Sequence, residues 1–297
     1  MQTTASHGGR RAAALAAVAA GLLAAGAAQA QNAYITNSGS DNVSVIDTVT
    51  NTLVGSPIAV GDNPQGVAVT RDGTKVYITN LGSDTVSVID TRTNAVVGDP
   101  IPVGDGPNGV AVTPDGKKVY VANEGSDTVS VIDTRTNRVV GDPIPVGDSP
   151  KGVAVTPDGK KVYVSGGRGS LAVIEAASDS VLGILNRIGS SAGLAVTPDG
   201  SRLYFANFVA DTVGVLDTAT DIVSDTPIPV GDSPVASGLF IGPSRTPFAG
   251  TPGAANCAGQ SLSAAARRYG GISAAARALG YGTVAQMQVA IRAFCKL

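Results

Sequence analysis

Several residue types that carry chemistry are scarce in this chain of 297 residues. It contains one histidine, His7, two cysteines and no tryptophan. Because His7 lies in a segment that we expect to be removed on export, the mature chain is predicted to have no imidazole group. This excludes a histidine-activated serine or cysteine nucleophile, a histidine-bound zinc ion and a histidine-ligated haem. The sequence therefore predicts no cofactor and no metal site.

Glutamate is nearly absent as well. Of the 23 acidic residues, only Glu124 and Glu175 are glutamates, and the other 21 are aspartates. The short aspartate side chain suits tight turns, where its carboxylate accepts hydrogen bonds from nearby backbone N–H groups. The acidic composition thus favours turn chemistry.

Charge is divided unevenly along the chain. Residues 31–243 hold all 23 acidic and 13 basic residues, a net charge of −10, whereas residues 244–297 hold 6 basic residues and no acid. A basic tail suits nucleic acid or a membrane surface. Export argues against nucleic acid, so we expect no nucleic-acid partner and consider that the tail either docks on the acidic body or contacts the cell envelope.

Residues 1–30 have the features of a signal peptide. Arg10 and Arg11 precede an apolar run that ends in a small-residue cleavage site, Ala28-Gln29-Ala30. The mature protein is therefore expected in the periplasm or at the cell surface, by Sec or twin-arginine export. No later segment is long and apolar enough to span a bilayer, so we expect no transmembrane segment in the mature chain.

One unit of about 43 residues recurs five times. The tyrosines that mark the units are Tyr34, Tyr77, Tyr120, Tyr163 and Tyr204, at spacings of 43, 43, 43 and 41. In the third unit we predict strands over residues 109–113, 118–122, 128–132 and 139–146. This period with four short strands is typical of a propeller blade. The sequence predicts an all-β protein, a five-bladed β-propeller of four-stranded blades, over residues 31–243.

Proline and the two ends of the repeat region complete this prediction. Pro143 and Pro145, which cannot donate to a strand ladder, place the fourth strand at the outer rim. The first unit begins at its second strand, and residues 238–241 match an inner strand without a blade of its own. Joining the two would close a ring of five blades. An open arc, or part of a larger ring made by two chains, is the alternative.

The repeats resemble the YVTN β-propeller family. The resemblance rests on tetrapeptides at Tyr34 and Tyr77 (Tyr-Ile-Thr-Asn) and at Tyr120 (Tyr-Val-Ala-Asn), followed by Val-Ser-Val-Ile-Asp-Thr and Thr-Pro-Asp-Gly elements. It implies an extracytoplasmic propeller with a binding role. Related propellers in nitrite reductases carry haem d1, and lactonase-like relatives hydrolyse lactones. The chain departs from the family in having five units rather than the common seven and in lacking haem-binding histidines.

Two sets of loop aspartates are expected at one end of the ring. One set follows Val-Gly: Asp62, Asp105, Asp148 and Asp232. The other set lies in the loop after the second strand: Asp41, Asp84, Asp127 and Asp211. They either form a carboxylate ring that binds a cationic partner or cap backbone N–H groups in turns. The second interpretation is favoured.

Symmetry is broken in the loops that follow the second strands. Glu124, Arg168 and Phe208 differ from their counterparts in equivalent loops of neighbouring units. They either line a small pocket near the axis or reflect drift in a tolerant loop. Together with the loop aspartates, they form the candidate binding face.

The C-terminal part has a different pattern. Residues 244–256 are rich in Pro, Gly, Ser and Ala and are predicted to be a linker. Residues 257–297 show three helical apolar stripes, with Thr283 as a cap of the third helix. Cys257 and Cys295 are predicted to form a disulfide that staples this small helical tail. Its resemblance to a helix-turn-helix is discounted because the last helix has little base-reading chemistry.

Because the sequence mostly repeats one surface, it favours a non-enzymatic protein. We predict a binding or scaffolding protein at the cell envelope, whose partner is an unknown protein or envelope component. Two alternatives stay open. One is a lactonase-like or other metal-dependent hydrolase, which needs unlike groups converging in one pocket. The other is a purely structural surface-layer component.

Overall fold

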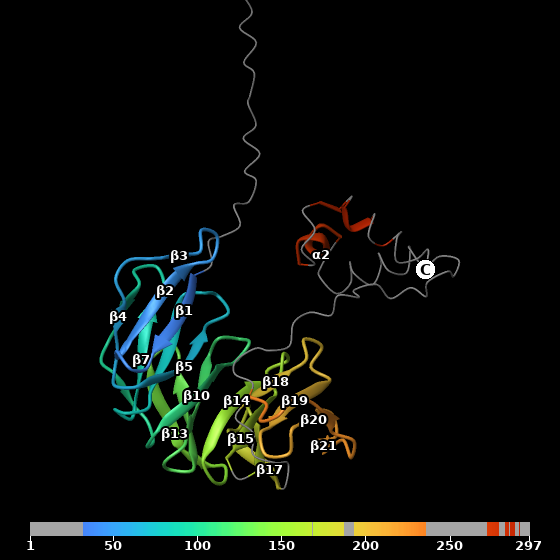
Figure 1. Cartoon of the computed structure of the whole chain (residues 1–297). Helices are drawn as coiled ribbons and strands as arrows, with labels where there is room; N and C mark the ends of the chain where they lie inside the picture. Colours follow the sequence, from blue (N-terminus) through green and yellow to red (C-terminus); the bar gives the residue numbers. More distant parts are fainter. Residues whose placement is uncertain are drawn as a thin grey trace, which may run out of the picture.

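The computed structural model describes residues 32–167, 169–186, 193–235 and 272–278, together with positions 283, 284, 286–288 and 291. The predicted signal peptide, residues 238–241, the linker 244–256, Cys257, Cys295 and Arg168 lie outside these residues. Within them, antiparallel sheets follow one another along the chain and stand side by side in an arc (Figure 1). Among the described residues, no helix is long and apolar enough to cross a membrane.

The third sheet shows the pattern of one repeat. Its strands are β10 (Pro107–Val112), β11 (Lys118–Asn123), β12 (Thr128–Asp133) and β13 (Arg138–Pro145), paired in that order. All four predicted strands are confirmed to within two residues at their start. The second strand is fully buried on both faces from Val119 to Ala122 because neighbouring sheets cover it.

The other sheets repeat this order. The first has β1 (Asn32–Asn37), β2 (Asn42–Asp47), β3 (Thr52–Leu53) and β4 (Ile58–Ala59). The second has β5 (Pro64–Val69), β6 (Lys75–Asn80), β7 (Thr85–Asp90), β8 (Ala95–Val96) and β9 (Ile101–Pro102). The fourth has β14 (Pro150–Val155), β15 (Lys161–Gly166), β16 (Ser170–Glu175) and β17 (Ser180–Asn186). The fifth has β18 (Leu194–Val196), β19 (Arg202–Asn207), β20 (Thr212–Asp217), β21 (Ile222–Val223) and β22 (Ile228–Pro229).

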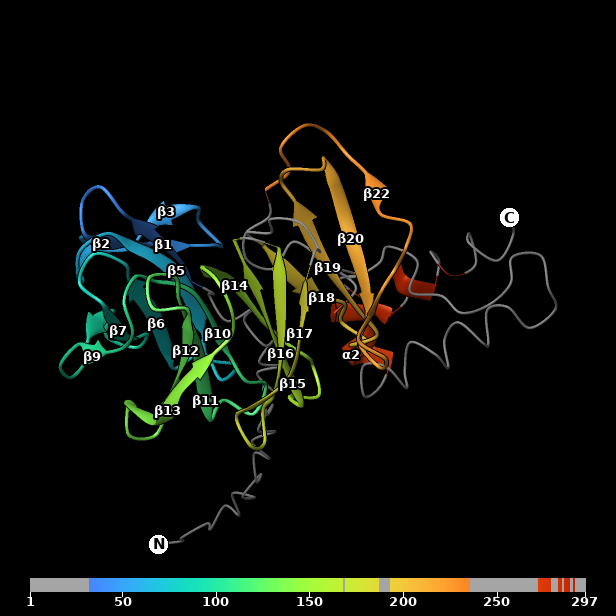
Figure 2. The same ribbon diagram turned by 90° about the horizontal axis from the view of Figure 1, so that it is seen from below.

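The predicted placement of inner and outer strands is confirmed. The inner strands β5, β10 and β14 contact one another across sheets (Figure 2). They approach closely at glycine, since a Cβ added to Gly109 would clash with the carbonyl oxygen of Lys151. The strands that carry the predicted rim prolines, such as β9 with Pro102 and β13 with Pro145, lie at the outer edge. In the second sheet, β8 and β9 both pair with β7.

Four apolar cores hold neighbouring sheets together. Between the second and third sheets, Tyr77, Val86 and Val88 of one sheet pack against Val119 and Val121 of the next. The other three pairs of neighbours have equivalent clusters. Burial of these aliphatic and aromatic groups is the main force that joins one sheet to the next.

A polar contact, which we call the tyrosine latch, accompanies each core. The hydroxyl of Tyr120 donates to Asp179 of the following sheet at 2.5 Å, and Lys118 forms an ion pair with the same carboxylate at 2.8 Å. Asp179 sits in a turn with a φ of 56°, a conformation that Asp and Asn tolerate. Equivalent latches join these pairs: Tyr34 to Asn94, Tyr77 to Asn137 and Tyr163 to Asp221.

The described sheets leave the arc open (Figure 1). As predicted, the first sheet begins at β1, the counterpart of β11, and has no inner strand among the described residues. Within the same residues, no strand of the first sheet makes a substantial contact with the fifth. The predicted closed ring is therefore not formed by this part of the chain, and residues 238–241, expected to close it, lie outside it.

The described part of the tail is helical. Helix α2 spans Ile272–Ala278 and buries Ala275 and Ala276. Further along, the Thr283 hydroxyl accepts a hydrogen bond from the Gln286 N–H at 3.2 Å, and the Gln286 side chain accepts one from the Thr283 N–H at 3.1 Å. This reciprocal pair is a capping box, which confirms Thr283 as a helix cap.

Candidate functional site

We call the end of the arc that carries the loops after the second strands the loop end. There, Asp41, Asp84, Asp127 and Asp211 have left-handed backbones with φ between 52° and 58°. Each carboxylate accepts a hydrogen bond at 2.7–2.8 Å from a backbone N–H about 22 residues further on, at Asn63, Gly106, Ser149 and Ser233. Asp41, Asp84 and Asp127 thus tie the chain that leads into the inner strand of the next sheet to the sheet that carries the aspartate. These contacts support the capping interpretation.

The second aspartate set lies beside the first. Asp62, Asp105, Asp148 and Asp232 are exposed. Their backbone groups serve the loops, because the carbonyl of Asp105 accepts the Gly125 N–H at 2.9 Å and its own N–H donates to Ser126 at 3.0 Å. Among the described residues, no group of three or more His, Cys, Asp and Glu side chains is placed to hold a metal ion.

Unlike groups do converge at Glu124. One carboxylate oxygen lies 3.1 Å from the Lys151 ammonium, and the other accepts a hydrogen bond from the Asn108 side-chain amide at 3.0 Å. Asn108 lies on β10 and Lys151 on β14, so the glutamate bridges the inner strands of two sheets. The side chains of Lys151 and Glu124 are 37% and 30% exposed, which leaves them accessible from solvent. A carboxylate, an ammonium and an amide thus meet at one point.

The broken repeat explains why this cluster occurs once among the residues that the structure describes. The residue in the position of Glu124 is Leu81 in the second sheet, Gly167 in the fourth and Phe208 in the fifth. Gly167 lies next to Lys151, since a Cβ at residue 167 would be in ordinary van der Waals contact with the Lys151 Cε atom at 3.7 Å. The Asn108 backbone is fixed by Thr79, whose hydroxyl donates to its carbonyl at 2.6 Å. The buried strand β6, which carries Thr79, therefore positions the backbone at Asn108.

The sequence prediction found part of this cluster. Glu124 was among the candidate residues, whereas Lys151 and Asn108 were missed. Both occupy the position after the proline that opens an inner strand, where the second sheet has Gln65. Comparing this position across repeats would have marked them. Phe208 lies on the fifth sheet and is 48% exposed, so it adds an apolar surface rather than a polar group.

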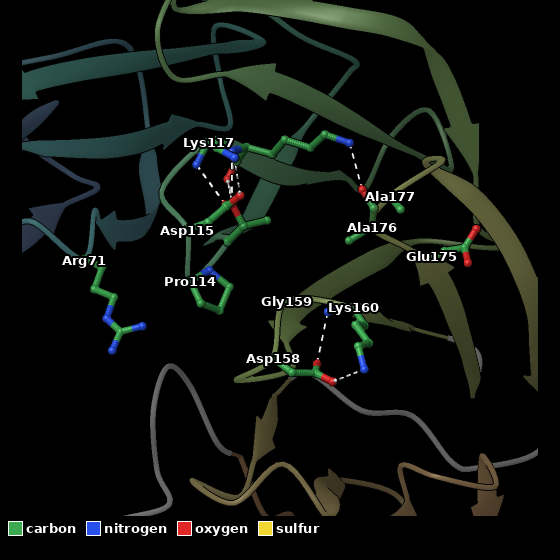
Figure 3. A pocket seen from close by; sticks show the side chains of 12 residues that line it. Arg71, Pro114, Asp115, Lys117, Asp158, Gly159, Lys160, Glu175, Ala176 and Ala177 are labelled. Atoms are coloured by element: carbon green, nitrogen blue, oxygen red, sulfur yellow. Dashed lines mark hydrogen bonds and ion pairs between the residues drawn. The ribbon is translucent and has the colours of Figure 1, made fainter. Parts of the chain in front are cut away.

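A cavity of about 720 Å³ lies at the opposite end, which we call the turn end (Figure 3). It is lined by the hairpins between first and second strands, which include Arg71, Lys117 and Lys160, and by residues 175–177 at the end of β16. Its carboxylates already serve their own turns. Asp115 accepts hydrogen bonds from Thr113 and the Lys117 N–H at 2.6 and 3.1 Å, which lower its pKa. The same contacts recur in the other hairpins, so these aspartates have a structural role that is repeated from sheet to sheet.

The order of strands, the side-by-side antiparallel sheets and the contacts between inner strands define a protein of the β-propeller type. Residues 32–139 and 59–221 match, as overlapping segments, the family described as "Lactonase, 7-bladed beta-propeller". The two segments span more than half of the chain, and the chain belongs to this family. The described sheets number five, whereas the family description gives seven blades. The YVTN resemblance remains a prediction.

Solved structures share the fold. A protein of Bacteroides uniformis ATCC 8492, provisionally described as a 6-phosphogluconolactonase, aligns with a TM-score of 0.61 and 18% identity over 71% of each chain. A functionally unknown protein from Desulfotomaculum acetoxidans DSM 771 aligns with a TM-score of 0.62 and 16% identity, over 70% of this chain and 68% of its own. Kuenenia stuttgartiensis hydrazine synthase aligns with a TM-score of 0.53 and 23% identity, over 70% and 85%. No curated protein matches the sequence.

Family membership corrects the functional prediction. The expectation of a non-enzymatic binding or scaffolding protein is wrong, because the family is one of lactonases. That expectation rested on the view that the repeat offers no convergence of unlike groups. The contacts of Glu124 with Lys151 and Asn108 provide one, since they join side chains of two repeats at positions where the residue changes from repeat to repeat. The comparison favours the lactonase-like alternative.

Proposed function

We propose that this protein hydrolyses a lactone at the loop end, with Glu124 as the general base. The observation that carries the proposal is the contact of Glu124 with both Lys151 and Asn108, at 3.1 and 3.0 Å, in a chain of the lactonase family. A carboxylate next to hydrogen-bond donors is the arrangement that ester hydrolysis needs, because water must lose a proton while the carbonyl oxygen gains negative charge.

The chemistry follows from the three side chains. The Glu124 carboxylate takes a proton from a water molecule as the water oxygen bonds to the lactone carbonyl carbon. The Lys151 ammonium and the Asn108 amide stabilise the resulting oxyanion. The carbon–ring oxygen bond then breaks, the ring oxygen receives the proton, and a hydroxy acid is released. The ammonium competes with a metal ion for the same carboxylate, so this donor set does not fit a divalent cation site.

The remaining features give the setting of this activity. We propose that the five repeats are five blades of a short propeller and that the predicted signal directs the enzyme outside the cytoplasm. The five tyrosine positions and the YVTN-like tetrapeptides support the first statement. Residues 1–30 support the second. Export would expose the enzyme to lactones of the periplasm or medium.

The test is a hydrolysis assay of the mature chain with a panel of γ- and δ-lactones, sugar lactones and a phosphorylated sugar lactone. We expect turnover of at least one lactone and its loss in Glu124→Gln. The matched control is Glu175→Gln, which changes the other glutamate, hydrogen-bonded to Ser178 at the turn end at 2.5 Å. No turnover across the panel would refute lactone hydrolysis. Loss of turnover in Glu175→Gln alone would refute the assignment to the loop end.

A further inference from the structure

The two ends of the arc carry complementary halves of one repeated interface. The leading face belongs to the first sheet and comprises Ala33, Ile35, Ile46 and Asn51. The trailing face belongs to the fifth sheet and comprises Arg202, Tyr204, Val213, Val215 and Ile228. By position in the repeat, they match the two sides of each of the four internal cores.

Among the described residues, two apolar positions that are buried in the internal cores are exposed at these ends. Ile35 is 48% exposed, whereas its counterparts Ile78 and Val121 are fully buried against the preceding sheet. At the other end Ile228 is 45% exposed, whereas its counterparts Ile101 and Ile144 are 4% and 6% exposed. Side chains equivalent to those of the internal cores therefore face solvent at both ends of the arc. A partner that covers them would bury apolar surface.

The polar halves show the same relation. Tyr204 and Arg202 occupy the donor positions of the tyrosine latch, and within the described residues their side chains donate no hydrogen bond. Asn51 occupies the acceptor position with a φ of 56°, like Asn137 at 52°. Its side chain likewise has no hydrogen-bond partner in the described part of the chain. The internal latch of Lys75 and Tyr77 on Asn137 shows that a cation, a tyrosine and an asparagine fit together there, at 3.0 and 2.9 Å.

We propose that the trailing face of one molecule binds the leading face of a second copy of this chain, head to tail. The contact would continue the four internal interfaces across two molecules, with Tyr204 and Arg202 on Asn51 of the neighbour and Ile35 buried beneath Tyr204. A second copy is the occupant because the two faces lie apart in the open arc (Figure 1) and no substantial contact joins them among the described residues.

This interface is heterologous, since each molecule uses two different faces. One molecule can therefore bind two neighbours. Assembly continues either until a ring of molecules closes or as an open chain whose length depends on protein concentration. Damage to one face leaves the other face able to bind. That property gives a test that intramolecular closure does not reproduce, and it is independent of any hydrolytic activity.

The test is sedimentation velocity of the full mature chain. Wild type is expected to form dimers and larger species as its concentration rises. Ile35→Glu and Tyr204→Asp, each alone, are expected to sediment only as monomers. An equimolar mixture is expected to form dimers and nothing larger, because each variant keeps one intact face. The control Leu182→Glu changes an exposed residue on the rim of the fourth sheet and is expected to assemble like wild type.

A wild type that stays monomeric over the whole concentration range would overturn the proposal, and so would a mixture without dimers while both variants keep the wild-type circular dichroism spectrum. If one variant misfolds, Tyr204→Phe gives a second measurement. It removes only the hydroxyl and is expected to weaken dimerisation about two- to tenfold, as for loss of one hydrogen bond. Unchanged dimerisation in Tyr204→Phe would contradict the latch.

Discussion

Tyr120 and Glu124 lie four positions apart in the third sheet, yet they belong to different parts of the molecule. Tyr120 makes a contact that recurs in every pair of neighbouring sheets, and it holds the arc together. Glu124 makes a contact that its counterparts Leu81 and Phe208 do not have the groups to make. In a repeat protein, recurring polar contacts explain stability, and the contact without a counterpart is the place to look for chemistry.

The largest difference between the Glu124 cluster and the recurring contacts is expected in the rate of lactone hydrolysis. Lys151→Gln removes the ammonium proposed to stabilise the oxyanion and should lower kcat/KM for the best lactone by about 10²-fold or more. The matched control is Lys160→Gln in the same sheet at the turn end, which should leave kcat/KM within about twofold. Equal losses in both variants would contradict a localised site.

The next largest effect should be the loss of folding stability when the close packing of the inner strands is disturbed. Gly109→Ala would place a methyl group against the Lys151 carbonyl and is expected to destabilise the fold by about 3 kcal/mol, the upper end for overpacking. Gly183→Ala is the control, because nothing lies within 4 Å of an added Cβ there. Urea unfolding measures both free energies. A Gly109→Ala variant as stable as wild type would show that the inner strands are not packed as described.

The tyrosine latch should contribute less. Tyr120→Phe removes a hydrogen bond to the Asp179 carboxylate and is expected to cost about 2 kcal/mol. Tyr204→Phe changes the same position of the fifth sheet and should leave the stability of the monomer nearly unchanged, because the described part of the chain forms no latch with Tyr204. Urea unfolding at low protein concentration compares them. Similar losses would mean that Tyr204 is latched within its own molecule.

The pH dependence of the latch should be the smallest effect. Burial raises the pKa of the Tyr77 hydroxyl to about 12, with smaller contributions from the Asp133 and Asp72 carboxylates. A raised native pKa means that the folded state holds the proton more tightly, so this stability is complete below pH 10 and is lost as the pH rises towards 12. Tyr77→Phe should have a flatter profile of unfolding free energy between pH 10 and 12. Identical profiles for wild type and Tyr77→Phe would show that Tyr77 does not contribute to the loss of stability at alkaline pH.

The sequence was sufficient to predict the sheets. A period of 43 residues, alternating apolar positions and Asp-Gly turns encode local structure, and the rim prolines mark the outer strand. Helix cap Thr283 followed from the same local rules. Partners across sheets were not predictable in this way. Asn137 lies 60 residues from Tyr77, and Lys151 lies 27 residues from Glu124.

Their adjacency depends on how one sheet packs on the next, and a period alone does not specify that register. The signal was nevertheless present, because the asparagines at the acceptor position of the latch, Asn51, Asn94 and Asn137, recur with the period of the tyrosines. The prediction that no enzyme is present failed for a related reason. Glu124, Lys151 and Asn108 are distributed over two repeats and become a cluster only in three dimensions.

A crystal structure of the mature protein with a lactam, the amide analogue of the lactone that is turned over, addresses the location of catalysis most directly. We predict that the lactam carbonyl oxygen lies within hydrogen-bonding distance of the Lys151 ammonium or the Asn108 amide, with its carbonyl carbon facing Glu124. A lactam bound beside Arg71 at the turn end, or on neither end of the arc, would contradict the account.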